Sequence, residues 1–240
     1  MYFNENRQLC YFLGFRENEV RNYNVFVTEL CDGNLNKQNH SFTLTQSIDI
    51  CKQLLKGLRQ LEQSDKCHND LKPENILYKT SGKKHENGDQ ELSIKIADFG
   101  TAGRTGGTPG WTWPCFVGER NPGRSDMYST ALLILYVMSD SRELFYRLRD
   151  NYIEGQSPWL TEFRADPLIA LVINMMSLKL TVHQCIERWA GIANSVWLLR
   201  EIDLNEMYDI PWPYFQIQDN LNAIQLADAT LLDKSVATND

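Results

Sequence analysis

Apolar and polar residues alternate in blocks near the start of the chain. Leu9–Phe15 and Asn24–Leu30 are rich in apolar, aromatic and β-branched side chains, and residues 17–22 between them are mostly polar. Short apolar runs that are bounded by polar turn residues are typical of strands. We therefore expect two antiparallel strands joined by a hairpin loop, with the second strand ending before Cys31.

The segment that follows Thr43 has helical periodicity. Thr43 and Gln46 have the spacing of a capping box, in which each side chain binds the backbone amide of the other residue. Apolar residues then recur every three or four positions, which places them on one face of a helix. They are Ile48, Cys51, Leu54, Leu55, Leu58 and Leu61. We expect this helix to pack on the core and to end before Asp65.

Further along the chain, two short apolar runs predict strands. These runs are Ile76–Tyr78 and Leu92–Ala97. The stretch between them, Thr80 to Glu91, is rich in Gly, Asn and charged residues, which favours a solvated hairpin loop.

Longer apolar stretches in the second half of the chain predict helices. The first begins at Asp126 and contains the apolar run Ala131–Met138, and two more cover Leu168–Leu178 and Thr181–Leu199. Within the last of these, Trp189 and Trp197 are expected to anchor the helix in the core.

The composition is that of a soluble globular protein, with 42% apolar and 23% charged residues in 240. A net charge of -7 and a pI near 5.2 argue against a nucleic-acid-binding face. The run Ala131–Met138 is too short to span a membrane, and charged residues among the first twenty argue against a secretory signal. The six cysteines occur singly, which indicates reduced thiols. We expect a cytoplasmic or nuclear protein that is not secreted and binds neither nucleic acid nor membrane.

One polar stretch concentrates reactive groups. His68–Leu77 reads HNDLKPENIL and holds a carboxylate, an ammonium and an amide between Asp70 and Asn75. A carboxylate can accept a proton from a hydroxyl, a lysine can neutralise a phosphate, and an Asn can complete a magnesium shell. Asp98-Phe99-Gly100 follows 23 residues after Asn75, at the end of an expected strand. A polar loop that turns at Pro73 is the alternative for the first stretch taken alone.

Together these stretches resemble the catalytic loop and the metal-binding tripeptide of eukaryotic protein kinases. Lys72 within LKPEN resembles the serine/threonine class, whereas Asn69 stands where the family usually has Arg. Gly107–Pro114 resembles the family's GTPxYxAP segment, which receives the substrate peptide. The Glu that usually closes this segment is Cys115 here, and its Arg partner corresponds to Lys179.

The resemblance implies an α+β, protein-kinase-like fold with a mainly helical large lobe and a truncated small-lobe sheet and hinge. It places a partial small lobe and hinge at residues 1–34, the large lobe at 35–200 and a C-terminal tail at 201–240. It also implies that Asp126 binds the backbone of the catalytic loop. A solvent-facing carboxylate near a helix N-terminus is the alternative for that residue.

The resemblance assigns chemical roles to four residues and implies ATP and Mg2+ as cofactors. Asp70 would accept or orient the proton of the substrate hydroxyl, and Lys72 would neutralise the γ-phosphate. Asn75 and Asp98 would hold Mg2+.

Four more residues would surround the adenine of ATP. Leu77 would lie beneath the ring, the backbone of Glu29 and Cys31 would bind its edge, and Thr28 would be the gatekeeper. The local sequence around Thr28 fits two ordinary edge strands equally well.

Several small-lobe features of the family are missing from this sequence. Residues 1–36 contain no lysine, and no G-x-G-x-x-G occurs in the chain. A truncated gene product and a kinase-like remnant both explain this pattern. Two functions stay open: a protein serine/threonine kinase, and a pseudokinase-type binding or scaffold module without catalysis. The expected partner is a protein substrate or a protein ligand, and the sequence defines no oligomeric state.

Overall fold

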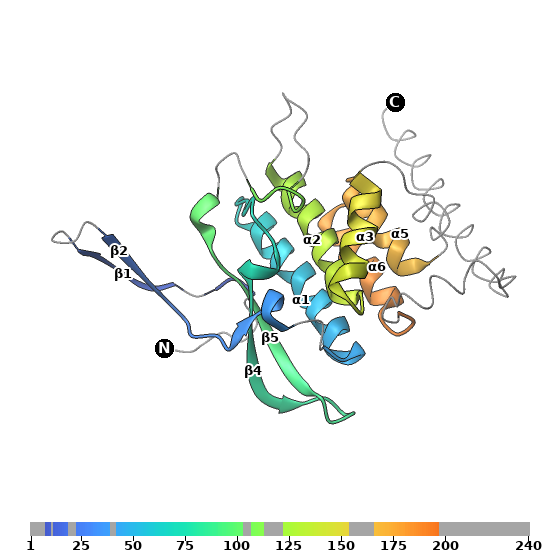
Figure 1. The fold of residues 1–240 in the computed structure, drawn as a ribbon, viewed down its shortest axis with the longest axis horizontal. Coiled ribbons are helices and arrows are strands. Elements are labelled where there is room, and N and C mark those ends of the chain that lie inside the picture. The colour runs from blue at the N-terminus through green and yellow to red at the C-terminus, as the bar shows by residue number, and fades with distance from the viewer. Residues whose placement is uncertain are drawn as a thin grey trace, which may run out of the picture.

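A long helix, α1 (Leu44–Gln63), lies at the centre of the fold. The computed structural model describes residues 8–10, 12–18, 23–38, 42–102, 107–112, 122–153 and 166–196. Helix α1 packs against three elements: α2 (Pro122–Met138), α6 (Val182–Ile192) and strand β5 (Gln90–Ile96). Figure 1 shows the helices grouped on one side and the strands on the other.

The start and the buried face of α1 confirm the sequence prediction. The Thr43 hydroxyl accepts a hydrogen bond from the Gln46 amide at 3.3 Å, and the Gln46 side chain accepts one from the Thr43 amide at 3.1 Å. On the inner face, Gly57 allows close packing, because a Cβ there would lie 2.6 Å from Cδ1 of Ile96 on β5. The helix ends at Gln63, before Asp65, as expected.

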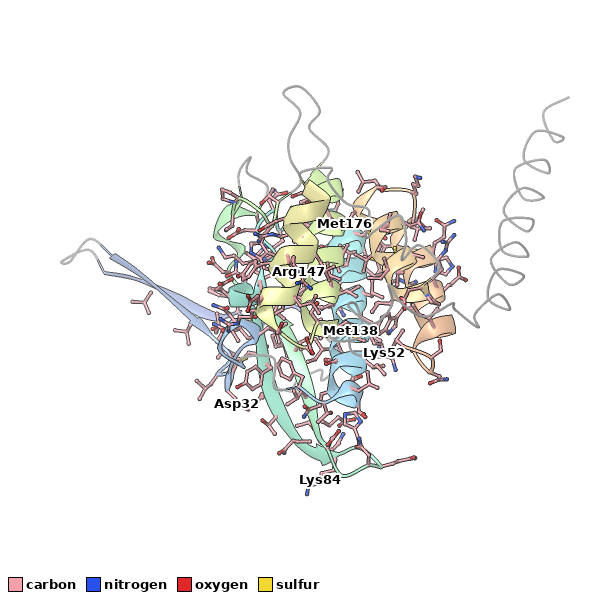
Figure 2. All side chains as sticks on the ribbon, turned by 45° about the vertical axis from the view of Figure 1, so that its right-hand side comes forward. Asp32, Lys52, Lys84, Met138, Arg147 and Met176 are labelled. Atoms are coloured by element: carbon pink, nitrogen blue, oxygen red, sulfur yellow. The ribbon has the colours of Figure 1, made fainter. Side chains whose placement is uncertain are left out.

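Three antiparallel strands, β3 (Gly33–Asn34), β4 (Ile76–Lys84) and β5, form one sheet in the described part of the chain. The hairpin expected between these two strands is present, but its loop is shorter than expected: β4 continues to Lys84 and β5 begins at Gln90, so residues 85–89 form the turn. Contacts with the start of α1 hold this extension. The Thr43 hydroxyl donates to Asp89 at 2.6 Å, and the Asn87 amide donates to the Thr45 hydroxyl at 2.8 Å. Lys84 marks the far end of the hairpin in Figure 2.

The antiparallel hairpin expected near the start of the chain is confirmed, with shifted boundaries. Its strands are β1 (Phe12–Asn18) and β2 (Tyr23–Thr28). Leu9 lies outside β1 and instead forms a parallel bridge with Ile96, because the Cys10 amide donates to the Ile96 carbonyl at 2.7 Å. The hairpin extends away from the helices in Figure 1.

Helix α2 is the buried helix that the apolar run predicts, and every residue from 125 to 139 is buried. Helix α3 (Arg142–Ile153), which follows it, was not predicted. The features that define α3 are close together in the sequence. The Ser141 hydroxyl accepts a hydrogen bond from the Leu144 amide at 3.1 Å, and Leu144 and Phe145 are fully buried. Within the described ranges, no helix is long and apolar enough to cross a membrane.

The last two described helices are α5 (Pro167–Met176) and α6. The expected extent of α6 is wrong, because the helix ends at Ile192. The amide and the hydroxyl of Ser195 both donate to the Ile192 carbonyl, which turns the chain away from the helix axis. Trp189 is a buried core residue as predicted. Trp197 and the tail 201–240 lie outside the described residues.

Candidate active site

Asp70 lies at the centre of a hydrogen-bonded cluster that includes Lys72 and Thr108. Its Oδ2 accepts from Lys72 Nζ at 2.8 Å, and its Oδ1 accepts from the Thr108 hydroxyl at 2.7 Å and the Thr108 amide at 2.9 Å. Lys72 Nζ also donates to the Thr108 hydroxyl at 2.7 Å. The three side chains therefore form a closed ring of contacts that fixes the carboxylate and the ammonium beside each other.

Asn75, in the 3-10 helix η2 (Pro73–Asn75), completes this cluster. Its Nδ2 donates to the Asp70 carbonyl at 2.8 Å and to Asp70 Oδ2 at 3.2 Å. The amide nitrogen is thus directed at Asp70, and the amide oxygen keeps its capacity as a ligand.

The environment of Asp70 favours its ionised form. Burial raises the pKa of this carboxyl, but the hydrogen bonds from Lys72 and Thr108 outweigh burial and the pKa is lowered. Asp70 is therefore a carboxylate at neutral pH, which is the form that can accept a proton.

Asp126 of α2 holds the loop that carries Asp70. Its two carboxylate oxygens accept hydrogen bonds from the His68 amide at 2.7 Å and the Asn69 amide at 2.8 Å. Burial raises the pKa of Asp126, and these two amides offset that shift only in part. The predicted bond between Asp126 and the backbone of this loop is confirmed.

His68 connects the same loop to the end of β5. Its Nε2 lies 2.9 Å from the Ala97 carbonyl, and its Nδ1 lies 3.3 Å from the Asp70 amide. A neutral imidazole with its proton on Nε2 satisfies both contacts, because Nε2 then donates and Nδ1 accepts. The His68 ring also packs on Phe99, with ring centroids 4.8 Å apart.

Asp98 follows β5 in the left-handed backbone region, at φ 62° and ψ 71°. Its side chain is exposed, and its Oδ1 accepts a hydrogen bond from the Gly100 amide at 3.3 Å. The Ala97 amide donates to the Asn75 carbonyl at 2.9 Å, so the segments that carry Asn75 and Asp98 adjoin.

The donor set of Asn75 and Asp98 fits Mg2+, which binds to one or two protein oxygens and completes its shell with water and phosphate. A dedicated all-protein cage is a different kind of site. The described residues contain no group of three or more His, Cys, Asp or Glu side chains that could form one.

The backbone explains the departure at Asn69. This residue has φ 66° and is buried, and Asn is one of the few non-glycine residues that adopt positive φ at low cost. The backbone conformation of the loop therefore favours Asn at a position where the family usually has Arg.

The segment from Gly107 to Thr112 lies directly against the loop that carries Asn69 and Asp70. Gly107 has φ 144°, and a Cβ there would overlap the Thr112 hydroxyl and lie 2.6 Å from the Asn69 carbonyl oxygen. Only glycine fits so close to the Asn69 carbonyl. This close approach places the next residue, Thr108, in contact with Asp70.

The substitution Gly107→Ala is expected to lower the free energy of unfolding by about 1–3 kcal/mol, because the added methyl group strains the backbone and displaces a neighbour. Gly191→Ala is the matched control. Gly191 is exposed near the end of α6 with no atom near its missing Cβ, so alanine there should stabilise the fold by about 0.5–1 kcal/mol. Urea unfolding of both variants measures the difference. Equal stability of the two variants would contradict the close approach of the two loops.

The four expected adenine-binding residues are not part of the Asp70 cluster. Thr28 is exposed at the end of β2 and donates to the Glu29 carbonyl at 3.5 Å. Glu29 pairs with Lys95, and Leu77 is half-buried on β4. Strand β4 begins directly after Asn75 and carries Leu77, so it connects the Asp70 cluster with the expected adenine-binding residues.

Cys31, also expected near the adenine, is half-buried. Burial, followed by the nearby Cys10 and Glu29, raises the pKa of its thiol to about 11. Cys31 is therefore a protonated thiol at neutral pH.

Sequence reasoning missed three residues at this site. The resemblance places Thr108 only in the segment that receives the substrate peptide, although its place in the Gly107-Thr108-Pro109 triplet is a signal. The sequence pattern gives no role to His68. It gives none to Lys95 either, although a single lysine inside the apolar strand SIKIA is unusual. Cys115 and its surroundings lie outside the described residues.

Comparison with known families decides the membership of this chain. The family model described as protein kinase domain matches residues 5–157, which is more than half of the chain. The chain belongs to the protein kinase family. This match confirms the resemblance to protein kinases and the α+β, kinase-like fold class that the sequence predicts. The predicted boundaries at residues 34 and 200 stay predictions.

Curated relatives of this kinase-family chain are similar over a limited segment. The serine/threonine-protein kinase ste20 of Aspergillus fumigatus is 28% identical over 139 residues, which are 53% of this chain and 14% of that protein. STE20 of Debaryomyces hansenii is 29% identical over 135 residues, covering 52% and 10%. The DNA damage response protein kinase DUN1 of Saccharomyces cerevisiae is 32% identical over 111 residues, covering 38% and 21%. The chain therefore matches less than a quarter of the length of each of these relatives.

Proposed function

We propose that this chain is the catalytic region of a protein serine/threonine kinase, which transfers the γ-phosphoryl group of ATP to a Ser or Thr hydroxyl of a protein. The observation that carries the proposal is the contact ring of Asp70, Lys72 and Thr108. Phosphoryl transfer depends mainly on positioning and electrostatic stabilisation, and such a ring of preorganised polar groups provides both. The names of the relatives favour the serine/threonine class.

The two charged residues of the ring have distinct roles in this proposal. Asp70 orients the substrate hydroxyl and accepts its proton, which its lowered pKa and its fixed geometry allow. Lys72 is held at Asp70 and Thr108 and neutralises charge on the transferred phosphoryl group.

Asn75 and Asp98 are the proposed ligands of Mg2+. A Mg2+ ion held by these two residues would neutralise charge on the phosphates. In the chain itself, the Asn75 amide nitrogen is held by Asp70, so its oxygen is the atom available to a metal. Asp98 is exposed and is held beside Asn75 by the Ala97–Asn75 backbone bond.

The adenine site of the proposal lies on the sheet. Leu77 lies beneath the ring, the backbone of Glu29 and Cys31 binds its edge, and Thr28 flanks it. The position of Leu77 two residues after Asn75 supports a continuous nucleotide site along the start of β4.

We also propose an intracellular location, cytoplasmic or nuclear. The five described cysteines are free thiols, which suits a reducing compartment.

A binding or scaffold module without catalysis is the second candidate. One observation favours it: residues 1–36 contain no lysine that could bind the ATP phosphates from the small-lobe side. The two candidates predict the same fold and differ in turnover.

Weak binding of Mg-ATP is expected for the 240-residue chain, with a dissociation constant above one micromolar. The proposed adenine and metal contacts are present, while the sequence has no glycine-rich motif to enclose the phosphates. A thermal-shift titration with ATP, run with Mg2+ and with EDTA, measures this affinity, and the shift should require Mg2+.

The matched pair of variants for that titration is Asp98→Asn and Asp65→Asn. Asp65 is an exposed residue with φ 52° near the end of α1, so it undergoes the same chemical change away from the site. Only Asp98→Asn should remove the Mg2+ dependence. Sub-micromolar affinity in the wild-type chain would show that the phosphates are held better than proposed, and equal behaviour of both variants would remove Asp98 from the metal site.

A further inference from the structure

Lys95 is a buried lysine on β5, an outer strand of the three-stranded sheet. It lies on β5 opposite Leu77 of β4, so the side chains of Lys95 and Leu77 share one face of the sheet. Its strand neighbours Ile94 and Ile96 lie on the other face and are buried in the core. Lys95 is therefore on the same face of the sheet as Leu77, the residue proposed to lie beneath the adenine ring.

The ammonium group of Lys95 pairs with Glu29, the first residue after β2. Its Nζ lies 3.6 Å from Glu29 Oε1, and both side chains are only 9% exposed. Removing two charges from water costs several kcal/mol per ion, and a pair of apolar residues of similar size is often at least as stable. Stability alone therefore does not explain an ion pair at this place.

The geometry of the chain after β2 suggests what the pair does. Leu30 is 85% exposed, so the middle of this segment makes little contact with the domain. The far end is fixed, because the Asp32 amide donates to the Tyr78 carbonyl at 2.9 Å and Asp32 Oδ2 accepts from the Thr80 amide at 2.7 Å. Asp32 is labelled against the sheet in Figure 2. Glu29 attaches the near end to β5 through Lys95.

We propose that the Glu29–Lys95 ion pair positions the segment from Glu29 to Cys31, so that its backbone groups face the adenine of a bound nucleotide. Lys95 is thus a positioning residue that acts through Glu29. This inference rests on the proposed nucleotide site and adds a determinant of base binding to it.

The double variant Glu29→Met/Lys95→Met tests the inference, because it removes both charges and leaves no unpaired buried ion. We expect a thermal midpoint equal to or above that of the wild-type chain. Affinity for Mg-ADP, measured by calorimetry, should fall about fivefold to tenfold, which corresponds to the loss of about one well-aligned hydrogen bond to the base. Affinity for Mg-pyrophosphate, which has no base, should not change.

The exchanged variant Glu29→Lys/Lys95→Glu restores the pair in the opposite sense and should recover most of the Mg-ADP affinity. Equal Mg-ADP affinity of the wild-type chain and the double methionine variant would overturn the inference and leave the proposed function intact. Equal losses for Mg-ADP and Mg-pyrophosphate would also overturn it, because a general structural effect would then be responsible. A wild-type chain that binds neither ligand would overturn the proposed nucleotide site itself.

Discussion

The substitution Asp70→Asn is expected to lower kcat for phosphoryl transfer by about 100-fold to 10,000-fold, the range that a positioned general base contributes. The amide has nearly the size of the carboxylate and can still accept from the Thr108 amide, so the loop should keep its shape. It cannot accept the hydroxyl proton, and it leaves Lys72 without its ionic partner. Affinity for Mg-ATP should change little, because the shorter bond that holds Asn75 goes to the Asp70 backbone carbonyl, which the substitution leaves in place.

Asp65→Asn is the control for this experiment, since it makes the same change on an exposed residue outside the site. Steady-state rates and ATP binding are measured for both variants at saturating peptide. Activity of Asp70→Asn equal to that of Asp65→Asn would remove Asp70 from the assigned role. A parallel loss of ATP binding would indicate that the carboxylate supports the nucleotide instead of the hydroxyl.

The substitution Asp126→Ala is expected to have the largest effect on stability, a loss of about 3 kcal/mol or more in the free energy of unfolding. Two amides, those of His68 and Asn69, lose charged acceptors at 2.7 and 2.8 Å, and Asp126 is only 2% exposed, so water cannot easily replace the carboxylate. Because these amides belong to the loop that carries Asp70, any activity should fall with stability. Urea unfolding and hydrogen exchange at the two amides measure the effect.

Asp166→Ala provides the comparison for Asp126→Ala. Asp166 is also buried and also accepts from two amides, those of Leu168 and Ile169, but it caps the start of α5. Loss of such a cap costs about 1 kcal/mol. Exchange at His68 and Asn69 should be unchanged in this variant. Similar exchange in both variants would contradict the anchoring role of Asp126.

Helix α1 could be predicted from the sequence because everything that defines it is local. The capping box of Thr43 and Gln46 spans four residues, and the apolar face repeats with the helical period. The end of the helix before Asp65 follows from the same pattern. Helix α3 had a local signal of the same kind in Ser141 and Leu144, and it was missed because its apolar residues are fewer.

The length of the β4–β5 hairpin could not be predicted, because its extended strands depend on contacts with distant residues. The polar composition of residues 80–91 favours a loop, and contacts such as Thr43 with Asp89, 46 residues apart, outweigh that local tendency. Local propensity is a weak guide where tertiary contacts decide.

The chemical groups of the candidate site were found from the sequence, whereas their contacts were not. Asp70, Lys72 and Asn75 are close in sequence, so a loop brings them together at once. Thr108 is 38 residues from Asp70, and the close approach of Gly107 to the Asn69 carbonyl in the folded chain brings it into the cluster. The Glu29–Lys95 pair needed the register of β4 and β5 to become visible.

Transfer of radiolabelled phosphate from Mg-ATP to a pool of Ser- and Thr-containing peptides by the purified 240-residue chain tests the central claim most directly. ATP is supplied at millimolar concentration, because binding is expected to be weak, and Asp70→Asn is assayed in parallel. The account predicts Mg2+-dependent label on Ser or Thr that falls to background in the variant. Label no higher than that of Asp70→Asn, from a folded chain that binds Mg-ATP, would contradict the kinase assignment and support a binding module.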